Sequence, residues 1–242
     1  MTSGETVTIT GPVVFFTGAG ASVGAGLPTY RGTGGLYEDT TLEPPHARDV
    51  TLEGLPALWA RFGPRLRRAE AVTPAPAHQS IAALEHDHDH ELDVTVVTQN
   101  VDDLHTAAGS TSVLELHGSL QRVRCMESNH TSALVDVTWR IDGVPLCPTC
   151  GDACRPDVVL FGESLPAGTW DAAAAAIRDA ATIVGVGTSA QVYPAVLLIA
   201  DDHTAHARRI WVNPETPPPT ENWDWMQATA DEALVRLLPA RE

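Results

Sequence analysis

The feature that most constrains this chain is a glycine-rich stretch placed directly after a short apolar run. Val13 to Thr17 is typical of a buried β-strand, and glycines at 18, 20, 24 and 26 follow it among small residues. A strand that runs through glycines into a helix start lets backbone N–H groups approach a diphosphate, because no Cβ intervenes and a helix N-terminus favours negative charge. The stretch therefore predicts a dinucleotide site.

The spacing of these glycines, G-x-G-x-x-x-G, differs from the G-x-G-x-x-G fingerprint of ordinary dehydrogenases. Glu38 lies at about the distance at which that fingerprint places a carboxylate for a ribose hydroxyl. Pro28 and the glycine-rich residues 32–35 interrupt the helix that would have to precede this carboxylate. We therefore interpret Glu38 as a loop residue.

The charge of the chain narrows the range of its partners. Lys and Arg together number 15 against 31 Asp and Glu, which gives a formal net charge of -16. Such a charge argues against a nucleic acid partner and suits basic peptides, although an acidic composition adapted for solubility explains it equally well. Residues 1–10 lack signal-peptide features and no stretch reaches membrane-spanning length, so we expect a cytoplasmic protein without a membrane partner.

Short β-branched runs alternate with helical patterns, which is typical of a parallel sheet covered by helices. The pattern predicts an α/β fold class with a Rossmann-like parallel sheet. We expect strands at residues 13–17, 94–98, 113–116, 158–161, 182–186 and 210–212, and helices at 171–181 and 231–238. Two regions interrupt the alternation, namely the glycine- and proline-rich residues 29–76 and residues 121–156.

Two groups of residues have the chemistry of metal ligands. All four cysteines lie between Cys125 and Cys154, and in the cytosol such clusters are more often metal ligands or free thiols than disulfides. Histidines and acids alternate from Glu85 to Glu91, which is consistent with a metal site but is explained equally well by a charged loop.

Polar residues follow two of the expected strands. Gln99, Asn100 and Asp102 come after residues 94–98, and His117-Gly118 follows residues 113–116. Ligands of open α/β sheets bind at the carboxyl ends of strands, and a histidine there is well placed for proton transfer near neutral pH. A single histidine of this kind is more often structural, so a catalytic role for His117 depends on the whole set of motifs.

Taken together, the motifs resemble those of the sirtuins, the NAD-dependent protein-lysine deacylases. The matching segments keep the family's order and cover nearly the whole chain: residues 18–31, 98–105, 117–118, 155–163, 187–189 and 212–214. The resemblance implies one catalytic domain over residues 1–242. Its Rossmann-like lobe would comprise 8–30, 76–120 and 157–242, and a smaller, helical and zinc-ribbon-like lobe would comprise 31–75 and 121–156.

The resemblance also implies a role for each matching residue. His117 would be the general base on a ribose hydroxyl of NAD, and Asn100 and Asp102 would hold the nicotinamide. The products would be free lysine, nicotinamide and 2′-O-acyl-ADP-ribose. The further cofactor contacts would be Gly18, Ala19, Gly20, Ser22, Tyr30, Arg31, Gln99, Gly187, Thr188, Ser189, Asn213, Glu215 and Ala230.

An acylated lysine peptide would add as an extended strand between residues 158–163 and 191–193. The contacts expected there are Val159, Phe161, Gly162 and Val192.

In many short bacterial sirtuins a Y-x-x-R pair binds the carboxylate of succinyl or malonyl groups, and the corresponding residues here are Phe62 and Arg65. Because phenylalanine has no hydroxyl, we expect deacetylation to be retained and desuccinylation to be weakened. Arg65, Arg67 and Arg68 also fit a plain solvated face.

The zinc site departs from the family's two C-x-x-C pairs. Cys147 and Cys150 form one pair and Cys125 begins the other, but Ser128 occupies its partner position. Three thiolates leave a tetrahedral structural site incomplete. Cys154, His130 or water would complete it, or zinc is lost; we favour Cys154 as a buried core thiol.

Two other functions stay open beside deacylation. An ADP-ribosyltransferase or NAD glycohydrolase uses the same cofactor, although hydrolysis of NAD needs neither His117 nor a peptide strand. A module that binds NAD without turnover is the third hypothesis. The family's usual state predicts a monomer.

Overall fold

Consecutive β-branched and aromatic residues build the centre of the fold, a six-stranded parallel sheet in the order β12-β11-β10-β2-β3-β4. The computed structural model describes residues 6–30, 34–37, 43–87, 92–199 and 204–239. Three strands were predicted to the residue: β2 (Val13–Thr17), β3 (Val94–Thr98) and β10 (Thr182–Val186). The others are β4 (Val113–Glu115), β11 (Arg208–Val212) and β12 (Asp224–Met226).

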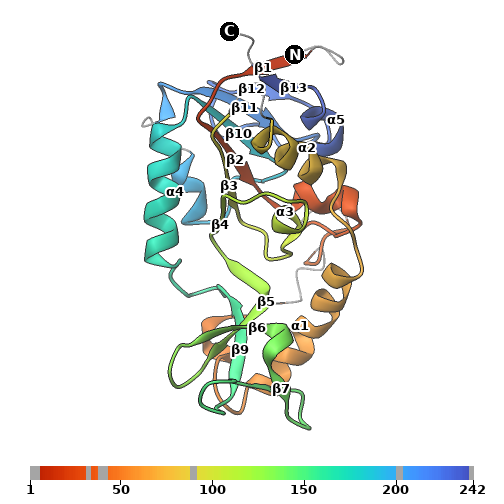
Figure 1. Ribbon diagram of the computed structural model, residues 1–242, viewed down its shortest axis with the longest axis vertical. Helices are drawn as coiled ribbons and strands as arrows, with labels where there is room; N and C mark the ends of the chain where they lie inside the picture. The colour runs from red at the N-terminus through yellow and green to blue at the C-terminus, as the bar shows by residue number, and fades with distance from the viewer. Residues whose placement is uncertain (1–5, 31–33, 38–42, 88–91, 200–203, 240–242) are drawn as a thin grey trace.

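Helices cover both faces of this sheet, which explains why its central strands are apolar throughout. Val13 and Phe15 pack with α2 (Pro76–Glu85) and α5 (Ala230–Leu234) in one core cluster. Val14 and Phe16 face the other way and pack with α4 (Ala167–Asp179) and the 3₁₀ helix η4 (Ala195–Leu198). Figure 1 shows α4 on one side of the sheet and α2 and α5 on the other. We call this sheet and its helices the large lobe.

Two helix predictions were wrong at their ends. The helix expected at 231–238 stops at Leu234, because Leu237–Pro239 (β13) pairs in parallel with Val7–Ile9 (β1) from the other end of the chain. Long-range strand pairing, which buries Leu237 and Val7, overrides the local helical pattern. The helix expected at 171–181 begins four residues earlier, directly after Pro166, whose backbone conformation suits a helix start, and ends at Asp179.

The small lobe contains α1 (Leu55–Glu70) and the antiparallel sheet β6-β5-β9. These strands are β5 (Gly118–Cys125), β6 (Thr131–Ala133) and β9 (Cys154–Val158), and a hairpin of β7 (Thr138–Trp139) and β8 (Pro145–Leu146) completes it. Apolar residues recur on α1 at helical spacing and face this sheet: Leu55, Leu58, Trp59, Phe62 and Leu66. Figure 1 shows this lobe below the parallel sheet.

The strand expected at 158–161 was wrong. β9 ends at Val158, because the Leu160 N–H donates to the Glu163 carboxylate at 2.8 Å and the chain turns away from the sheet. The remaining short elements are the 3₁₀ helices η1 (Ala19–Ala25), η2 (Ala47–Asp49) and η3 (Leu134–Asp136), and helix α3 (Leu104–Ala107). Within the described ranges, no helix has both the length and the apolar character needed to cross a membrane.

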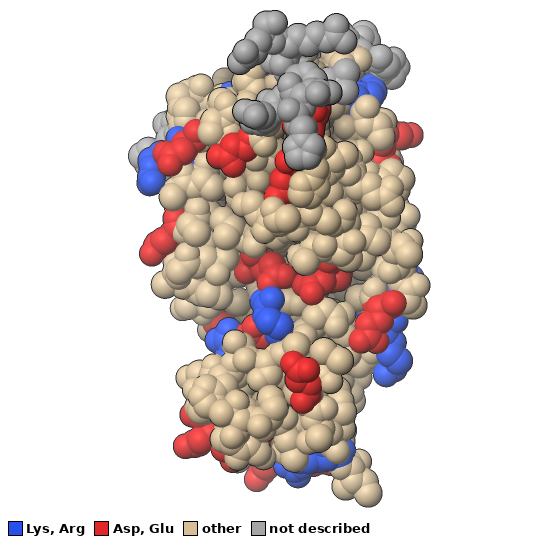
Figure 2. Space-filling model, viewed as in Figure 1, with Lys and Arg blue, Asp and Glu red and all other residues tan. Residues whose placement is uncertain are grey.

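An ionic network links the two lobes where β4 leads into β5. Arg122 lies 2.7 Å from the Glu115 carboxylate and 3.0 Å from that of Asp157, which also pairs with Arg124 at 2.6 Å. Burial, together with a hydrogen bond to Asp103, raises the pKa of Glu115 to about 7. Figure 2 shows acidic and basic side chains gathered at this level between the lobes.

Candidate active site

The glycine loop packs against the end of β10. The Gly20 N–H donates to the Gly187 carbonyl at 2.8 Å, and a Cβ on Gly20 would lie 2.6 Å from the Gly187 Cα. Only glycine permits this approach, which joins the carboxyl ends of β2 and β10. The helix expected after β2 is a 3₁₀ helix, η1, which holds Ala19, Gly20 and Ser22.

Ser22 stands at the centre of a hydrogen-bonded group. Its hydroxyl donates to Asp102 Oδ2 at 2.7 Å and accepts from Asn100 Nδ2 at 3.1 Å. Asn100 Nδ2 also donates to the Gly18 carbonyl at 3.1 Å. The structure thus brings together four of the predicted residues from the ends of two neighbouring strands. Their donors and acceptors fix one another before any ligand arrives.

His78, which was not predicted, supports this group from α2. Its Nδ1 accepts from the Ala75 N–H at 3.2 Å, so Nε2 carries the proton and faces the Ser22 oxygen at 3.4 Å. Burial lowers the pKa of His78, against the opposing effects of Asp102 and Asp231. The side chain is fully buried on the apolar face of its helix. In the sequence its position is that of any core residue, so no signal marked it.

Side-chain hydrogen bonds connect the ends of β3, β10 and β11 through Gln99, Thr188 and Asn213. Gln99 Nε2 donates to the Thr188 hydroxyl at 3.0 Å, and Asn213 Nδ2 donates to the Thr188 carbonyl at 3.0 Å. Asn213 Oδ1 accepts from the Glu215 N–H at 3.0 Å, which turns the chain after β11. These predicted contacts therefore form one edge, at the carboxyl ends of β3, β10 and β11.

His117 lies directly after β4 and is half-buried. Its Nδ1 is 2.8 Å from the Gln99 carbonyl oxygen. A carbonyl can only accept, so Nδ1 carries the proton and Nε2 is the basic atom of the neutral ring. Burial lowers the pKa of His117, although the bond to Gln99 acts in the opposite direction. The imidazole is therefore neutral and able to accept a proton at pH 7.

Gly118 fixes the backbone beside this histidine. Its φ is +77°, and a Cβ there would lie 2.0 Å from the Asp157 carbonyl oxygen. The His117 carbonyl accepts from the Val159 N–H at 2.9 Å. The candidate base is thus tied to the start of the segment expected to contact the peptide.

The rest of that segment lies against the turn before η2. The Phe161 carbonyl accepts from the Ala47 N–H at 2.8 Å, and a Cβ on Gly162 would lie 2.4 Å from the His46 ring. The exposed Phe161 ring is 6.1 Å from that of Tyr30, a predicted cofactor contact. Val192, on the other expected peptide segment, is half-buried before η4.

The remaining predicted cofactor contacts lie around these groups. Ser189 is exposed after β10, and Ala230 is the buried first residue of α5. The next residue, Asp231, accepts from the Ala77 N–H at 2.9 Å, which joins α5 to α2. Arg31 and Glu38 lie outside the described residues.

Arg65 and Phe62, the residues expected at the Y-x-x-R positions, differ in their surroundings. Phe62 is 5% exposed and belongs to the small-lobe core, whereas Arg65 is half-buried. The Arg65 guanidinium donates to the hydroxyl of Tyr37, and its Cζ lies 5.1 Å from the centre of that ring. Tyr37 was not predicted, because nothing in the spacing of the sequence links it to α1.

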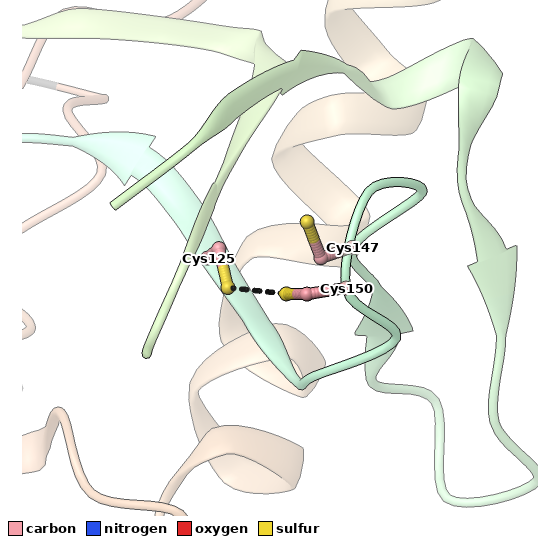
Figure 3. Close-up of side chains that lie close together, drawn as sticks. All are labelled: Cys125, Cys147 and Cys150. Atoms are coloured by element: carbon pink, nitrogen blue, oxygen red, sulfur yellow. Dashed lines mark hydrogen bonds between the residues drawn. The ribbon is translucent and has the colours of Figure 1, made fainter. Parts of the chain in front are cut away.

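The structure brings Cys125, Cys147 and Cys150 together at the end of β5 and in the turn after β8. Their sulfur atoms lie within 4.8 Å of one another, and Cys125 Sγ is 3.4 Å from Cys150 Sγ (Figure 3). Hydrogen bonding from the Cys150 N–H lowers the pKa of Cys147 to about 7. Thiolates at this separation suit zinc, whose Zn–S bonds of about 2.3 Å place tetrahedral sulfurs just under ~4 Å apart.

Cys154 and the described part of the tract from Glu85 to Glu91, which the sequence left open as alternative metal ligands, lie outside this cluster. Cys154 is fully buried in the small-lobe core, and burial together with the neighbouring Cys147 and Cys125 raises its pKa to about 12. In the acid and histidine tract, the Glu85 carboxylate accepts from the Thr111 and Ser112 N–H groups, and His86 Nε2 is 2.9 Å from the Gly109 carbonyl. Residues 88–91 of that tract lie outside the described residues. Within the described part of the chain, the cysteines alone form a three-ligand cluster.

Comparison with known proteins supports the assignment that these motifs suggest. The chain is 40% identical over 233 residues to NAD-dependent protein deacylase 2 of Pyrobaculum aerophilum, an alignment covering 93% of this chain and 89% of the relative. It is 38% identical over 232 residues to NAD-dependent protein deacylase Sir2 of Mycolicibacterium smegmatis, covering 93% and 95%.

Solved structures agree with these relatives. A Sir2 homologue mutant in complex with ADP-ribose superimposes with a TM-score of 0.81 at 34% identity, over 92% of this chain and 88% of the other. A Sir2 complex with a p53 peptide and NAD⁺ superimposes with a TM-score of 0.72 at 28% identity, over 93% and 90%. The Sir2 family model matches residues 18–194. The chain therefore belongs to the Sir2 family.

Proposed function

We propose that this protein removes acyl groups from lysine side chains of other proteins, with NAD as co-substrate. The observation that carries the proposal is the tautomer of His117, which leaves Nε2 basic at the carboxyl end of β4, while Asn100 and Asp102 follow the neighbouring strand β3. Relatives named as NAD-dependent protein deacylases, and related complexes with ADP-ribose and with peptide plus NAD⁺, support it.

The polar edge of the parallel sheet is the site we assign to NAD. Backbone groups of the glycine loop, with Ser22, would meet the diphosphate, while Thr188 and Asn213 would meet the adenosine half. Asp102, whose Oδ2 accepts from Ser22, would orient the nicotinamide carboxamide. The remaining contacts proposed are Gly18, Ala19, Gly20, Tyr30, Arg31, Gln99, Asn100, Gly187, Ser189, Glu215 and Ala230.

The chemistry requires a base at the sugar and a pocket that favours loss of nicotinamide. NAD supplies the ribose carbon that takes up the acyl oxygen once nicotinamide has left. His117 Nε2 accepts the proton of a ribose hydroxyl, and the Nδ1 bond to Gln99 keeps the ring oriented as it does so. Gln99 also contacts Thr188, so the orientation of the base is coupled to the end of β10.

The acylated lysine has to come from a partner, because the 242 residues contain arginine but no lysine. The net charge of -16 favours basic peptides. We propose that the peptide lies along Val159, Phe161 and Gly162 on one side and Val192 on the other. We also propose that the protein acts as a monomer.

We further infer that Arg65 and Tyr37 form a site for a carboxylate on the acyl group. Acids outnumber basic residues 31 to 15, yet no ion pair of the described residues includes Arg65. Its guanidinium carbon lies 5.1 Å from the centre of the Tyr37 ring and 5.4 Å from that of the Phe62 ring. The Tyr30 ring is tilted against that of Tyr37, with centres 4.7 Å apart, and its centre lies 6.1 Å from that of Phe161. The Tyr37 hydroxyl thus supplies the hydrogen bond that Phe62 lacks.

The decisive experiment incubates the protein with NAD and an acetyl-lysine or succinyl-lysine peptide, and detects O-acyl-ADP-ribose by mass spectrometry. Deacylation predicts that nicotinamide release depends on the peptide and equals the amount of O-acyl-ADP-ribose. Release without peptide would favour an NAD glycohydrolase, and ADP-ribose attached to the peptide would favour a transferase. Because the chain has no lysine, every acyl-lysine signal comes from the peptide.

A further inference from the structure

The three-cysteine cluster needs a fourth ligand, and the β5–β6 hairpin supplies one beside it. The strands pair with Arg122 opposite Ala133, Val123 opposite Ser132 and Arg124 opposite Thr131. Continuing this register by one residue places Cys125 opposite His130, and the Cys125 N–H donates to the His130 carbonyl at 2.8 Å. Side chains of directly opposed residues lie on the same face of a sheet, with Cβ atoms about 5 Å apart.

The turn of this hairpin directs a second contact toward the thiols. Asn129 has a φ of +56°, which lets the chain reverse between Ser128 and His130. The Ser128 hydroxyl then lies 3.8 Å from Cys150 Sγ and 2.9 Å from His130 Nδ1. His130 is therefore joined to the cluster twice, through the register with Cys125 and through Ser128.

We propose that His130 is the fourth ligand of a Cys₃His zinc site with Cys125, Cys147 and Cys150. A neutral imidazole is a common zinc ligand, whereas the hydroxyl of Ser128 is a weak one. His130 is exposed, and its Nδ1 lies 2.9 Å from the Ser128 hydroxyl, which is placed to accept the Nδ1–H while Nε2 binds the metal. The inference concerns the small lobe and is independent of the proposed deacylation.

Cys154 is the competing candidate, since it lies opposite Cys125 on the other side of β5. Its thiol is fully buried in the small-lobe core and lies 3.9 Å from the Asp152 carbonyl, to which it donates. Its sulfur also falls outside the mutually close set formed by the other three. Recruiting Cys154 would move a side chain of the packed core, whereas recruiting His130 would move an exposed one.

The experiment measures metal in the full-length protein and uses catalytic activity only as a side observation. Zinc content by elemental analysis and zinc affinity by chelator competition are compared for the wild type, His130→Ala, Ser128→Ala and Cys154→Val, each checked for folding by circular dichroism. We expect one zinc per wild-type chain. His130→Ala should weaken zinc binding by ~100-fold or more, because loss of an outer-shell partner alone costs 10–100-fold. Ser128→Ala should weaken it less, and Cys154→Val should leave it unchanged.

Cobalt spectroscopy identifies the donor atoms directly. Co²⁺ in the wild type should give the ligand-field bands of three sulfurs and one nitrogen. Ser128→Cys, which adds a fourth thiol to the cluster, should give those of four sulfurs. A wild type that binds neither metal under reducing conditions would overturn the proposal. So would unchanged zinc affinity and cobalt bands in His130→Ala, or loss of zinc in a folded Cys154→Val.

Discussion

His117 and Gln99 are joined by a 2.8 Å hydrogen bond from the imidazole Nδ1 to the backbone carbonyl oxygen. This bond settles the tautomer, since the carbonyl cannot donate, and leaves Nε2 as the basic nitrogen. The same Gln99 reaches across to Thr188 with its side chain. Gln99 therefore orients the proposed base through its backbone carbonyl and contacts the carboxyl end of β10 through its side-chain amide.

Replacing this histidine should stop acyl transfer without removing NAD binding. In His117→Ala we expect formation of O-acyl-ADP-ribose to fall by about 10²–10⁴-fold, the usual value of a positioned general base. NAD affinity, measured by calorimetry, should change little because the Ser22, Asn100 and Asp102 group remains intact. His206→Ala, at an exposed loop histidine, is the matched control. Full transfer activity in His117→Ala would refute the assigned role.

The same ring predicts the acid limb of the activity profile. Burial lowers the pKa of His117 below its ordinary value of 6.5, and the base works only when neutral. The midpoint of the acid limb of kcat/KM, which follows the free enzyme's base, should therefore lie below pH 6.5. The profile of kcat/KM against pH with an acetylated peptide measures this midpoint. A midpoint above 6.5 would show that the ring is not held neutral by burial.

The sequence predicted the parts of the fold in which local pattern and tertiary environment agree. β2, β3 and β10 are buried on both faces, so their apolar runs have no other stable position than inside the sheet. Leu237–Pro239 and residues 159–161 were misread because their structure depends on a distant partner strand and on the Glu163 carboxylate. The lobe boundaries proposed from the motifs stay a prediction.

The candidate site likewise divides into residues marked by local sequence and residues placed by distant contacts. The sequence predicted Gly18, Ser22, Asn100 and Asp102 because they lie within contiguous motifs at strand ends, and the structure joins them by hydrogen bonds. His78 and Tyr37 were missed because their importance comes from contacts across the fold, to Ser22 and to Arg65. No periodicity or spacing distinguishes such residues from ordinary core or loop positions.

Buried histidines predict loss of stability in acid. His105 Nε2 lies 3.0 Å from the Thr17 hydroxyl, which itself donates to Thr98, so Nε2 carries the proton. The buried Nδ1 has no hydrogen-bond partner among the described residues. Burial, reinforced by His78, lowers the pKa of His105 to about 3. In the unfolded chain His105 is therefore protonated below about pH 6.5, whereas in the folded chain it stays neutral down to about pH 3. This contribution to stability is present above pH 6.5 and is lost as the pH falls through that window.

The variant His105→Leu isolates this effect. The slope of the unfolding free energy against pH, measured by denaturant titration between pH 6 and 4, should decrease by about 1.4 kcal/mol per pH unit, the value for one proton. His86→Leu, which changes an exposed histidine, should keep the wild-type slope. An identical slope in His105→Leu and the wild type would contradict the buried, unprotonated state.

The contact between Tyr37 and Arg65 predicts which acyl groups the protein accepts. If the hydroxyl and guanidinium bind one carboxylate, Tyr37→Phe should lower the ratio of desuccinylation to deacetylation in kcat/KM by ~10- to 100-fold, because a hydrogen bond to a charged group is worth about 1.5–3 kcal/mol. Phe62→Tyr should raise the same ratio by adding a second hydroxyl near Arg65.

The contributions of the Arg65 charge and of the Tyr37 hydroxyl can be measured separately. Arg65→Met should reduce desuccinylation more than Tyr37→Phe does, because it removes the positive charge as well as the donor geometry. Arg68→Met removes an exposed charge from α1 and should leave the ratio unchanged. Deacetylation serves as the internal reference, since an acetyl group has no carboxylate to bind. If Tyr37→Phe and Arg65→Met lower both activities equally, the pair supports the small lobe and does not select the acyl group.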